Sequence, residues 1–378
     1  MKRVMVVYGT RPEAIKMAPV VQAMAESTTV ESQVVVTGQH RAMLDQVNDL
    51  FGIRPAHDLD ILLPRQTLED ITSRTLVGLR DLLEKESPDA VLVQGDTTTC
   101  FAAALGAFYH QIPVIHLEAG LRTNDRLNPF PEEVNRRLTT QLASLHLAPT
   151  ATSRANLLRD GVDPEAVVVT GNTVIDALLD VVGRGAPLSR PELKGLRGRR
   201  LVLITAHRRE SWGEPMRQCG RAIGRLATTF PDVAFLLPAH LNPVVREALM
   251  PILRGRDNVT ITEPLDYGDF ATVMSWAEVV LTDSGGVQEE APSLGKPVLV
   301  MRDTTERPEA VTAGTVRLVG TQEDRIVDEV RRLLTESAAY RAMAQAVNPY
   351  GDGKAAARCV AAMEHFFGHG QRPVEFAP

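Results

Sequence analysis

Short apolar runs rich in β-branched residues alternate with amphipathic stretches along the whole chain. In the first half the runs lie at residues 4–8, 34–37, 90–94, 114–117, 145–148 and 167–170; in the second half they lie at 201–205, 233–237, 259–262, 278–282, 298–301 and 316–319. Near-continuous apolar strands separated by helices predict parallel sheets covered on both faces. We therefore predict an α/β protein.

The two sets of strands are separated by residues 183–200, a stretch rich in Gly, Pro and Arg that we expect to be a solvated connection. A chain of 378 residues is long enough for about two domains. We predict two doubly wound domains with a cleft between them. Ligands of such sheets bind at the carboxyl ends of the strands.

Composition narrows the possible partners. A net charge of −6 argues against nucleic acid, which usually requires a basic face. Cys100, Cys219 and Cys359 are far apart and have no metal-ligand spacing, which is typical of a reducing cytosol. The first apolar run is too short for a signal peptide, and no segment reaches membrane-spanning length. We expect a soluble cytoplasmic protein.

The stretch at 281–290, LTDSGGVQEE, follows a predicted buried strand and opens a short helix. Gly285 and Gly286 let the backbone approach a ligand, and the free N–H groups of a first helical turn suit a phosphate. Glu290, about one turn further, could accept hydrogen bonds from ribose hydroxyls. The alternative is a plain glycine turn with Ser284 as the N-cap.

A second anion site is indicated after the first strand, in GTRPEAIK. Thr10 and Glu13 have capping-box spacing, which explains them structurally. Arg11 and Lys16 are not explained in this way, because helix starts prefer anions. Two cations there suggest a bound anion.

Acidic residues follow two further strands of the first domain. Asp96 comes just after the strand at 90–94, where it could simply cap the helix that Thr97 begins. Glu118 ends the strand at 114–117, and a carboxylate there is costly unless it has partners or a task.

A third acid, Glu132, opens the helix predicted from PFPEEVNRR. Its structural explanation is an i,i+4 pair with Arg136, beside a second pair of Glu133 with Arg137. Together, however, the three acids lie at successive strand or helix ends of one domain. Carboxylates whose pKa values are pushed apart by crowding are suited to proton transfer at carbon.

In the second domain, His207 directly follows a strand and is flanked by cations, which would favour a neutral imidazole unless a phosphate is near. His240 also lies after a strand. Each could be an ordinary loop residue. Arg307 follows the strand at 298–301 and adds a cation to the same end of the sheet.

Nine segments together resemble the non-hydrolysing UDP-N-acetylglucosamine 2-epimerases. They are GTRPEAIKMAP, GDTTT, HLEAGLRT, PFPEEVNRRLT, GNTVIDAL, HRRES, HLNP, TDSGGVQEEAPSLGKPVLVMRDTTERPEAVTAGTVRLVG and NPYGDG, and they extend from residue 9 to residue 353. The resemblance implies a GT-B-like α/β fold of two doubly wound Rossmann-type domains facing across a cleft. Residues 1–170 would form the first domain, joined by a C-terminal helix at 354–378, and residues 171–353 the second. It also implies a homodimer and no organic cofactor.

The family's reaction is the reversible conversion of UDP-GlcNAc into UDP-ManNAc, by elimination of UDP to 2-acetamidoglucal and re-addition of UDP. The product supplies cell-envelope polysaccharide. By resemblance, the catalytic residues are Asp96, Glu118, Glu132 and His207. Substrate would also contact Arg11, Lys16, Arg136, Leu265, Phe270, Ser284, Gly285, Gly286, Glu290 and Arg307, with Leu265 using its backbone and Phe270 lying near the uracil.

Some family members bind a second UDP-GlcNAc as an activator. The corresponding positions here are Gln39, His40, Arg65, Gln66, Arg208 and His240. Two positions depart from the family pattern. Ala42 replaces a residue that is often polar, which bears on activator affinity. Gln94 replaces the usual His before the Gly-Asp pair, and we expect it to affect only local hydrogen bonding.

Two other functions fit parts of this pattern. A UDP-sugar-dependent glycosyltransferase shares the architecture but needs an acceptor site and does not need three acids opposite the nucleotide. A nucleotide-sugar-binding regulator would not need Asp96, Glu118, Glu132 and His207 together. A nicotinamide dehydrogenase is disfavoured, since no GxGxxG follows the first strand.

Overall fold

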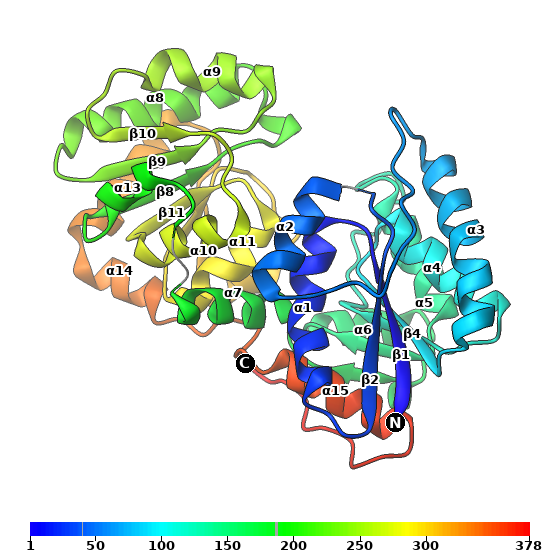
Figure 1. Cartoon of the computed structure of the whole chain (residues 1–378). Coiled ribbons are helices and arrows are strands. Elements are labelled where there is room, and N and C mark those ends of the chain that lie inside the picture. Colours follow the sequence, from blue (N-terminus) through cyan, green and yellow to red (C-terminus); the bar gives the residue numbers. More distant parts are fainter. Residues whose placement is uncertain (40, 186–187) are drawn as a thin grey trace. The chain divides into compact units, whose positions relative to one another are not determined.

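The computed structural model describes residues 1–39, 41–185 and 188–378, except for the side chain of residue 42. The chain divides into two compact units. Unit 1 comprises Met1–Ala177 and Tyr350–Pro378, and unit 2 comprises Leu178–Pro349. Each unit contains one parallel β-sheet (Figure 1). The boundaries lie at 177/178 and 349/350, where the sequence suggested 170/171 and 353/354.

Unit 1 is built on a seven-stranded sheet of order β3-β2-β1-β4-β5-β6-β7. Its strands are β1 (Lys2–Tyr8), β2 (Val30–Val36), β3 (His57–Asp58), β4 (Ala90–Gln94), β5 (Val114–Leu117), β6 (Leu145–Ala148) and β7 (Val167–Val169). All neighbours are parallel. The order changes direction between β1 and β4, so the carboxyl ends of these two strands border the switch point where such sheets bind ligands.

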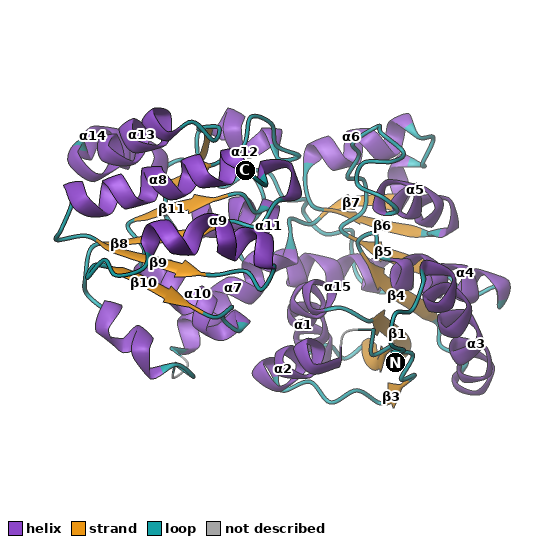
Figure 2. Cartoon of the chain, turned by 90° about the horizontal axis from the view of Figure 1, so that it is seen from above, coloured by secondary structure: helices purple, strands orange, loops and turns teal. Residues whose placement is uncertain are grey.

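Helices cover both faces of this sheet (Figure 2). The helices of unit 1 are α1 (Arg11–Ala25), α2 (Arg41–Phe51), α3 (Leu68–Glu86), α4 (Thr98–Tyr109), α5 (Glu132–Leu142), α6 (Ala151–Arg159) and α15 (Ala355–Phe366), with the first residues of α7 (Thr173–Arg184). Helices α3, α4 and α5 pack in series on one face, and α1 packs with α2 and α15 on the other. The strands between them are nearly all buried, as expected for a sheet with two apolar faces.

The C-terminal helix α15 is attached to unit 1 by hydrogen bonds at its start. The backbone N–H groups of Ala355 and Ala356 donate to the carboxylate of Asp176 on α7, at 3.2 and 2.8 Å. A carboxylate is a good acceptor for the free N–H groups of a helix N-terminus. Burial nevertheless raises the pKa of Asp176 to about 6.

A close approach explains the glycine that ends β1. A Cβ atom at Gly9 would lie 2.1 Å from Oγ1 of Thr37 and 2.9 Å from Oγ1 of Thr99. No other residue fits without displacing these side chains, which come from the ends of neighbouring elements. The turn into α1 is therefore packed tightly against the end of β2 and the start of α4.

Unit 2 is built on a six-stranded parallel sheet of order β10-β9-β8-β11-β12-β13. Its strands are β8 (Leu201–Thr205), β9 (Ala234–Pro238), β10 (Val259–Thr262), β11 (Val279–Thr282), β12 (Val298–Val300) and β13 (Val316–Leu318). Its helices are α8 (Glu214–Thr229), α9 (Pro243–Leu253), α10 (Tyr267–Trp276), α11 (Gly285–Glu290), α12 (Pro308–Ala313), α13 (Glu323–Thr335) and α14 (Ser337–Ala344). The switch point lies between β8 and β11.

The prediction of two doubly wound Rossmann-type sheets in a GT-B-like α/β protein is confirmed. Every predicted strand is present, although β2 begins four residues earlier than expected, and the two-residue strand β3 was missed. The stretch 183–200 is mostly exposed in its described part, as predicted, with a few contacts to the rest of the unit. Within its described part, Leu193 and Leu196 are buried, and Nη2 of Arg190 donates to the carbonyl of Pro264 at 3.1 Å. In the described ranges, no helix is long and apolar enough to cross a membrane.

Candidate active site

Glu118 lies directly after β5 and is 8% exposed. Nζ of Lys16 lies 2.6 Å from both of its carboxylate oxygens, and Nδ2 of Asn172 lies 3.5 Å from Oε1. Gln94 donates to Oε2, so the local hydrogen bonding that we expected it to affect involves a candidate catalytic group. The backbone φ of Glu118 is +62°, a conformation that non-glycine residues adopt at a cost and often at functional sites.

Asp96 does not cap the helix that follows it. That position is taken by Thr97, whose side chain accepts a hydrogen bond from the N–H of Cys100 at 3.0 Å. The carboxylate of Asp96 is therefore not needed for capping, and it pairs with the guanidinium of Arg136 on α5. Its backbone carbonyl accepts from Nδ2 of Asn135 at 3.0 Å. Two residues of α5 thus fix the loop that carries Asp96.

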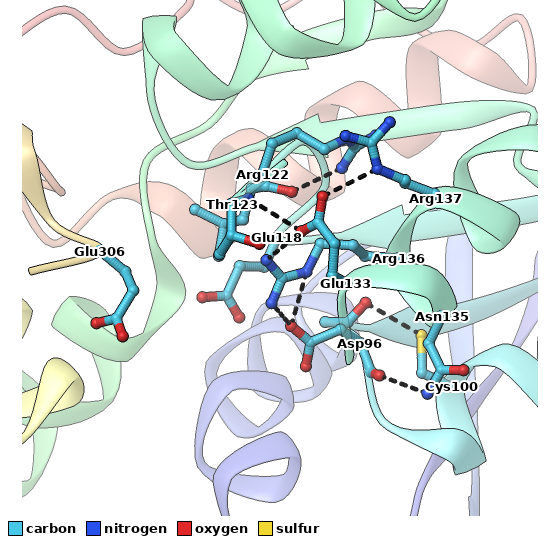
Figure 3. A network of polar contacts seen from close by, with 12 residues as sticks. Asp96, Cys100, Glu118, Arg122, Thr123, Glu133, Asn135, Arg136, Arg137 and Glu306 are labelled. Carbon is cyan, nitrogen blue, oxygen red and sulfur yellow. Dashed lines mark hydrogen bonds and ion pairs between the residues drawn. The ribbon is translucent and has the colours of Figure 1, made fainter. Parts of the chain in front are cut away.

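The predicted pair of Glu132 with Arg136 is wrong, because Arg136 turns to Asp96 and to Glu133 instead (Figure 3). Glu133 is fully buried and also pairs with Arg137, as predicted. Burial raises the pKa of Glu133, but the N–H of Thr123 and the two arginines outweigh this effect and leave the pKa below its ordinary range.

Glu132 differs from these acids. Among the described residues it makes no ion pair, and its Oε2 is buried without a hydrogen-bond partner. A buried carboxylate oxygen without a hydrogen-bond donor is left to accept a hydrogen bond from a ligand. Of the three candidate acids, Asp96 and Glu118 are held by cations and Glu132 is not.

The capping box at the start of α1 is present and extends further than predicted. Oε2 of Glu13 accepts from the N–H and hydroxyl of Thr10 at 2.8 and 2.7 Å, and Oε1 accepts from Thr97 at 2.6 Å. Burial raises the pKa of Glu13 and these hydrogen bonds oppose the rise. Arg11, on the same turn, is half-buried and makes no hydrogen bond or ion pair with the part of the chain that the structure describes. It is available to an anion.

In unit 2, His207 is fixed by a residue that the sequence reasoning missed. Nδ1 of His207 lies 2.9 Å from Oδ1 of Asp283, and Oδ2 of Asp283 accepts from the backbone N–H of His207 at 2.6 Å and of Arg208 at 2.8 Å. Oδ1 makes no regular hydrogen bond, so the side-chain contact is an ion pair by distance. The ring of His240 stacks on that of His207, with centroids 5.7 Å apart.

The Ser-Gly-Gly turn begins α11, with Ser284 at the N-cap position as predicted. Its side chain makes no capping hydrogen bond. A Cβ atom at Gly285 would lie 3.5 Å from Nη2 of Arg208 and 4.0 Å from Nη2 of Arg307. Two guanidinium groups and a helix start therefore converge on one point, which is a suitable arrangement for a diphosphate.

Glu290 is buried at the end of α11 and accepts a hydrogen bond on Oε1 from the hydroxyl of Tyr267 at 2.9 Å. Burial raises the pKa of Tyr267 well above its ordinary value, and Glu290 raises it further, so the hydroxyl remains a donor. Phe270 lies on the same helix, α10, and Leu265 is buried just before it. The two residues assigned to uracil and the one assigned to ribose thus come from adjoining segments.

The residues expected to hold an activator fall in both units. Gln39 accepts from the hydroxyl of Thr99 at 3.0 Å, and Gln66 accepts from the N–H of Leu63 at 3.1 Å. Arg65 is exposed with φ of +58°. His40 lies outside the described residues, as does the side chain of Ala42. Arg208 and His240 lie beside the Ser-Gly-Gly turn and His207, next to residues that we assigned to substrate.

Asp283 and Tyr267 are the residues that sequence reasoning overlooked. Asp283 had a signal, since an acid ends a buried strand just before the glycine turn, as Glu118 ends β5. Tyr267 had none, because the contact depends on how α10 lies against α11. Within the described ranges, no group of three or more His, Cys, Asp or Glu side chains is arranged to hold a metal ion.

The chain is similar to known proteins over nearly its whole length. The family model described as UDP-N-acetylglucosamine 2-epimerase matches residues 22–364. A probable UDP-N-acetylglucosamine 2-epimerase of Ralstonia nicotianae is 54% identical over 374 residues, covering 97% of this chain and all of the relative. The crystal structure of a putative UDP-N-acetylglucosamine 2-epimerase from Listeria monocytogenes, 49% identical, matches with a TM-score of 0.94 over all of both chains. The UDP-GlcNAc 2-epimerase from Neisseria meningitidis bound to UDP-GlcNAc, 48% identical, matches with a TM-score of 0.87 over 96% of this chain and all of that one. The chain belongs to the UDP-N-acetylglucosamine 2-epimerase family.

Proposed function

We propose that this protein interconverts UDP-GlcNAc and UDP-ManNAc by elimination and re-addition of UDP. The observation that carries the proposal is the cluster of carboxylates around β4, β5 and the start of α5. Asp96 and Glu118 are paired with the cations Arg136 and Lys16, and Glu132 has no such partner among the described residues. The family to which this chain belongs, whose members are named for UDP-N-acetylglucosamine 2-epimerase activity, supports the same reaction.

The chemistry requires a base, an acid and an electrostatic partner for the leaving group. A base removes the proton from carbon 2, and the carbon 1–oxygen bond breaks with its electron pair leaving on UDP. The remaining sugar is 2-acetamidoglucal. UDP then adds back at carbon 1 while an acid delivers a proton to the opposite face of carbon 2. Charge develops on the diphosphate, so cations held at that point lower the barrier.

The two units would divide this work. Unit 1 supplies the carboxylates for proton transfer at carbon 2, together with Arg11 as a cation without a described partner. Unit 2 binds UDP: the Ser284–Gly286 turn with Arg307 holds the diphosphate and Glu290 the ribose. His207 would stabilise the departing UDP.

Glu132 is the best candidate for the group that exchanges a proton with carbon 2. Asp96 and Glu118 are each engaged by a cation, Arg136 and Lys16. Glu132 has a buried, unpartnered oxygen and no ion pair in the described part of the chain. Its Oε2 is therefore left for a contact with the substrate.

We further propose that the enzyme works in the cytoplasm as a homodimer without an organic cofactor, and that its product supplies cell-envelope polysaccharide. A second UDP-GlcNAc would act as an activator through Gln39, Arg65, Gln66, Arg208 and His240. Initial rates with UDP-ManNAc alone should then be very low and rise when a little UDP-GlcNAc is added. Full activity on pure UDP-ManNAc, with hyperbolic kinetics, would contradict activation.

The reaction can be tested by proton NMR of UDP-GlcNAc incubated with this protein alone in heavy water. UDP-ManNAc should form with deuterium at carbon 2, and some 2-acetamidoglucal and UDP should appear over long incubation. A glycosyltransferase would show no epimerisation without an acceptor. Accumulation of unlabelled UDP-ManNAc would contradict the elimination mechanism.

A further inference from the structure

We infer that Asp283 is a positioning residue that holds the imidazole of His207 with a proton on Nδ1 and Nε2 free for the substrate. The inference rests on the proposed function, in which His207 stabilises departing UDP. It adds a residue to that function and states which nitrogen of His207 acts.

The strand order brings the two residues together. β8 and β11 are parallel neighbours, with Thr205 opposite Thr282 in the register. His207 follows the first strand and Asp283 the second, so both lie at the switch point of unit 2. The N–H of Asp283 donates to the carbonyl of Thr205 at 3.2 Å, which fixes the carboxylate beside the loop that carries His207.

The contacts specify an ionised acceptor. Asp283 is 1% exposed. Burial raises its pKa, but Nδ1 of His207 and the N–H groups of Arg208 and His207 outweigh this and hold the pKa below its ordinary range. Nδ1 of His207 lies 2.9 Å from Oδ1, outside regular hydrogen-bond geometry, and a carboxylate can only accept, so a small rotation of the ring that completes this contact requires the proton on Nδ1.

The surroundings of the His207 ring are also consistent with a fixed orientation. His240 stacks on one side with an interplanar angle of 24°, and its pKa is lowered by burial and by His207. The side chain of His207 is 36% exposed, so its free edge is open to a ligand. With Nδ1 facing Asp283, Nε2 is the nitrogen left for the substrate, and it donates to a diphosphate oxygen when the ring is protonated on both nitrogens. A carboxylate behind a histidine orients the ring and stabilises its charged form in the same way elsewhere.

Asp283→Asn provides a direct test. The amide oxygen can keep the two backbone N–H bonds, while the amide NH₂ would face Nδ1 and move the proton to Nε2. We expect kcat to fall by about 10²- to 10⁴-fold, as when an amide replaces the carboxylate of a catalytic triad. UDP affinity and the melting temperature should change little. The matched control is Asp257→Asn, at an exposed aspartate of the same unit, which should behave like the wild type.

The variant must be combined with His207→Gln, because a positioning residue acts only through its target. In the His207→Gln background, Asp283→Asn should lower kcat by less than about 3-fold, since the effects of residues that act as a unit are not additive. An equal loss in both backgrounds would overturn the inference and make Asp283 a structural residue only.

Nitrogen-15 NMR of His207 in the wild-type protein gives a second measurement that needs no activity and no folded variant. Nδ1 should carry a proton. The two possible failures are distinguishable: absence of turnover by the wild type contradicts the proposed function, whereas normal turnover with an unprotonated Nδ1 contradicts the inference alone.

Discussion

The ammonium group of Lys16 lies 2.6 Å from both carboxylate oxygens of Glu118, and both side chains are largely buried. Lys16 lies on α1 and Glu118 after β5, 102 residues further along the chain. The pair therefore joins the helix that follows β1 to the loop that follows β5. It places a charge of each sign beside the switch point of the first sheet.

Lys16→Met should destabilise unit 1, because it leaves the charge of Glu118 buried without its cation. Breaking such a pair costs about 3–5 kcal/mol. Hydrogen exchange of peptides from β5 and α1 should show local opening that is easier by that amount. Adding Glu118→Gln should recover a large part of the loss, since two neutral groups require no ion pair. Equal exchange in the wild type and Lys16→Met would contradict the buried pair.

Glu132→Gln should slow epimerisation by about two to four orders of magnitude, the usual contribution of general acid–base catalysis. UDP affinity and the melting temperature should be preserved, because Glu132 makes no ion pair with the described residues. The neighbouring Glu133→Gln is the matched comparison. Glu133→Gln removes the charge of a buried carboxylate that pairs with two arginines, so the melting temperature of this variant should fall markedly. A large loss of stability in Glu132→Gln would contradict the assignment of Glu132 to catalysis and of Glu133 to stability.

Glu290→Gln should weaken UDP binding by roughly 1–3 kcal/mol, since a neutral amide is a poorer acceptor for ribose hydroxyls. Calorimetry with UDP and 2′-deoxy-UDP identifies the contact. The wild type should prefer UDP, and Glu290→Gln should lose most of this preference. Tyr267→Phe, which removes the hydroxyl at 2.9 Å from Glu290, should have a smaller effect of the same kind. If Glu290→Gln kept the preference for UDP over 2′-deoxy-UDP, Glu290 would not be the residue that binds the ribose.

Acid should destabilise unit 1 through His116. Burial lowers the pKa of His116 to about 4, from an ordinary value of 6.5. The unfolded chain therefore binds more protons between these values, so the stabilisation is complete above pH 6.5 and is lost as the pH falls toward 4. His116→Gln can still donate to the carbonyl of Gly95, which accepts from Nε2 at 2.7 Å in the wild type.

The difference in free energy of unfolding between the wild type and His116→Gln should change by about 2–3 kcal/mol between pH 7 and pH 4.5, in favour of the variant at low pH. Calorimetric melting at several pH values measures it. His146 has its pKa lowered to about 3 by burial, with His116 adding to the effect, and changes stability in the same direction. A constant difference would show that His116 does not titrate as described.

The sequence by itself determined the strands and the sheet class. Residues 90–94, 114–117, 145–148, 201–205 and 259–262 were predicted with the bounds of β4, β5, β6, β8 and β10. For β4 and β8 this is possible because a strand buried on both faces requires an unbroken apolar run, which is a local property of the chain. β10 lies at the edge of its sheet and is only partly buried, and its β-branched residues mark it instead. The two-residue strand β3 has no such run. The capping box of Thr10 and Glu13 was also predicted, because it is a local signal.

Only the tertiary structure decided which side chains meet. Arg136 could pair with Glu132 one turn away, but packing of α5 against α4 and β5 turns it to Asp96, 40 residues earlier. The partner of His207 is Asp283, 76 residues later, because β8 and β11 are neighbours in the sheet. Such contacts depend on strand order, and strand order results from the burial of the whole sheet, which no short stretch of sequence contains.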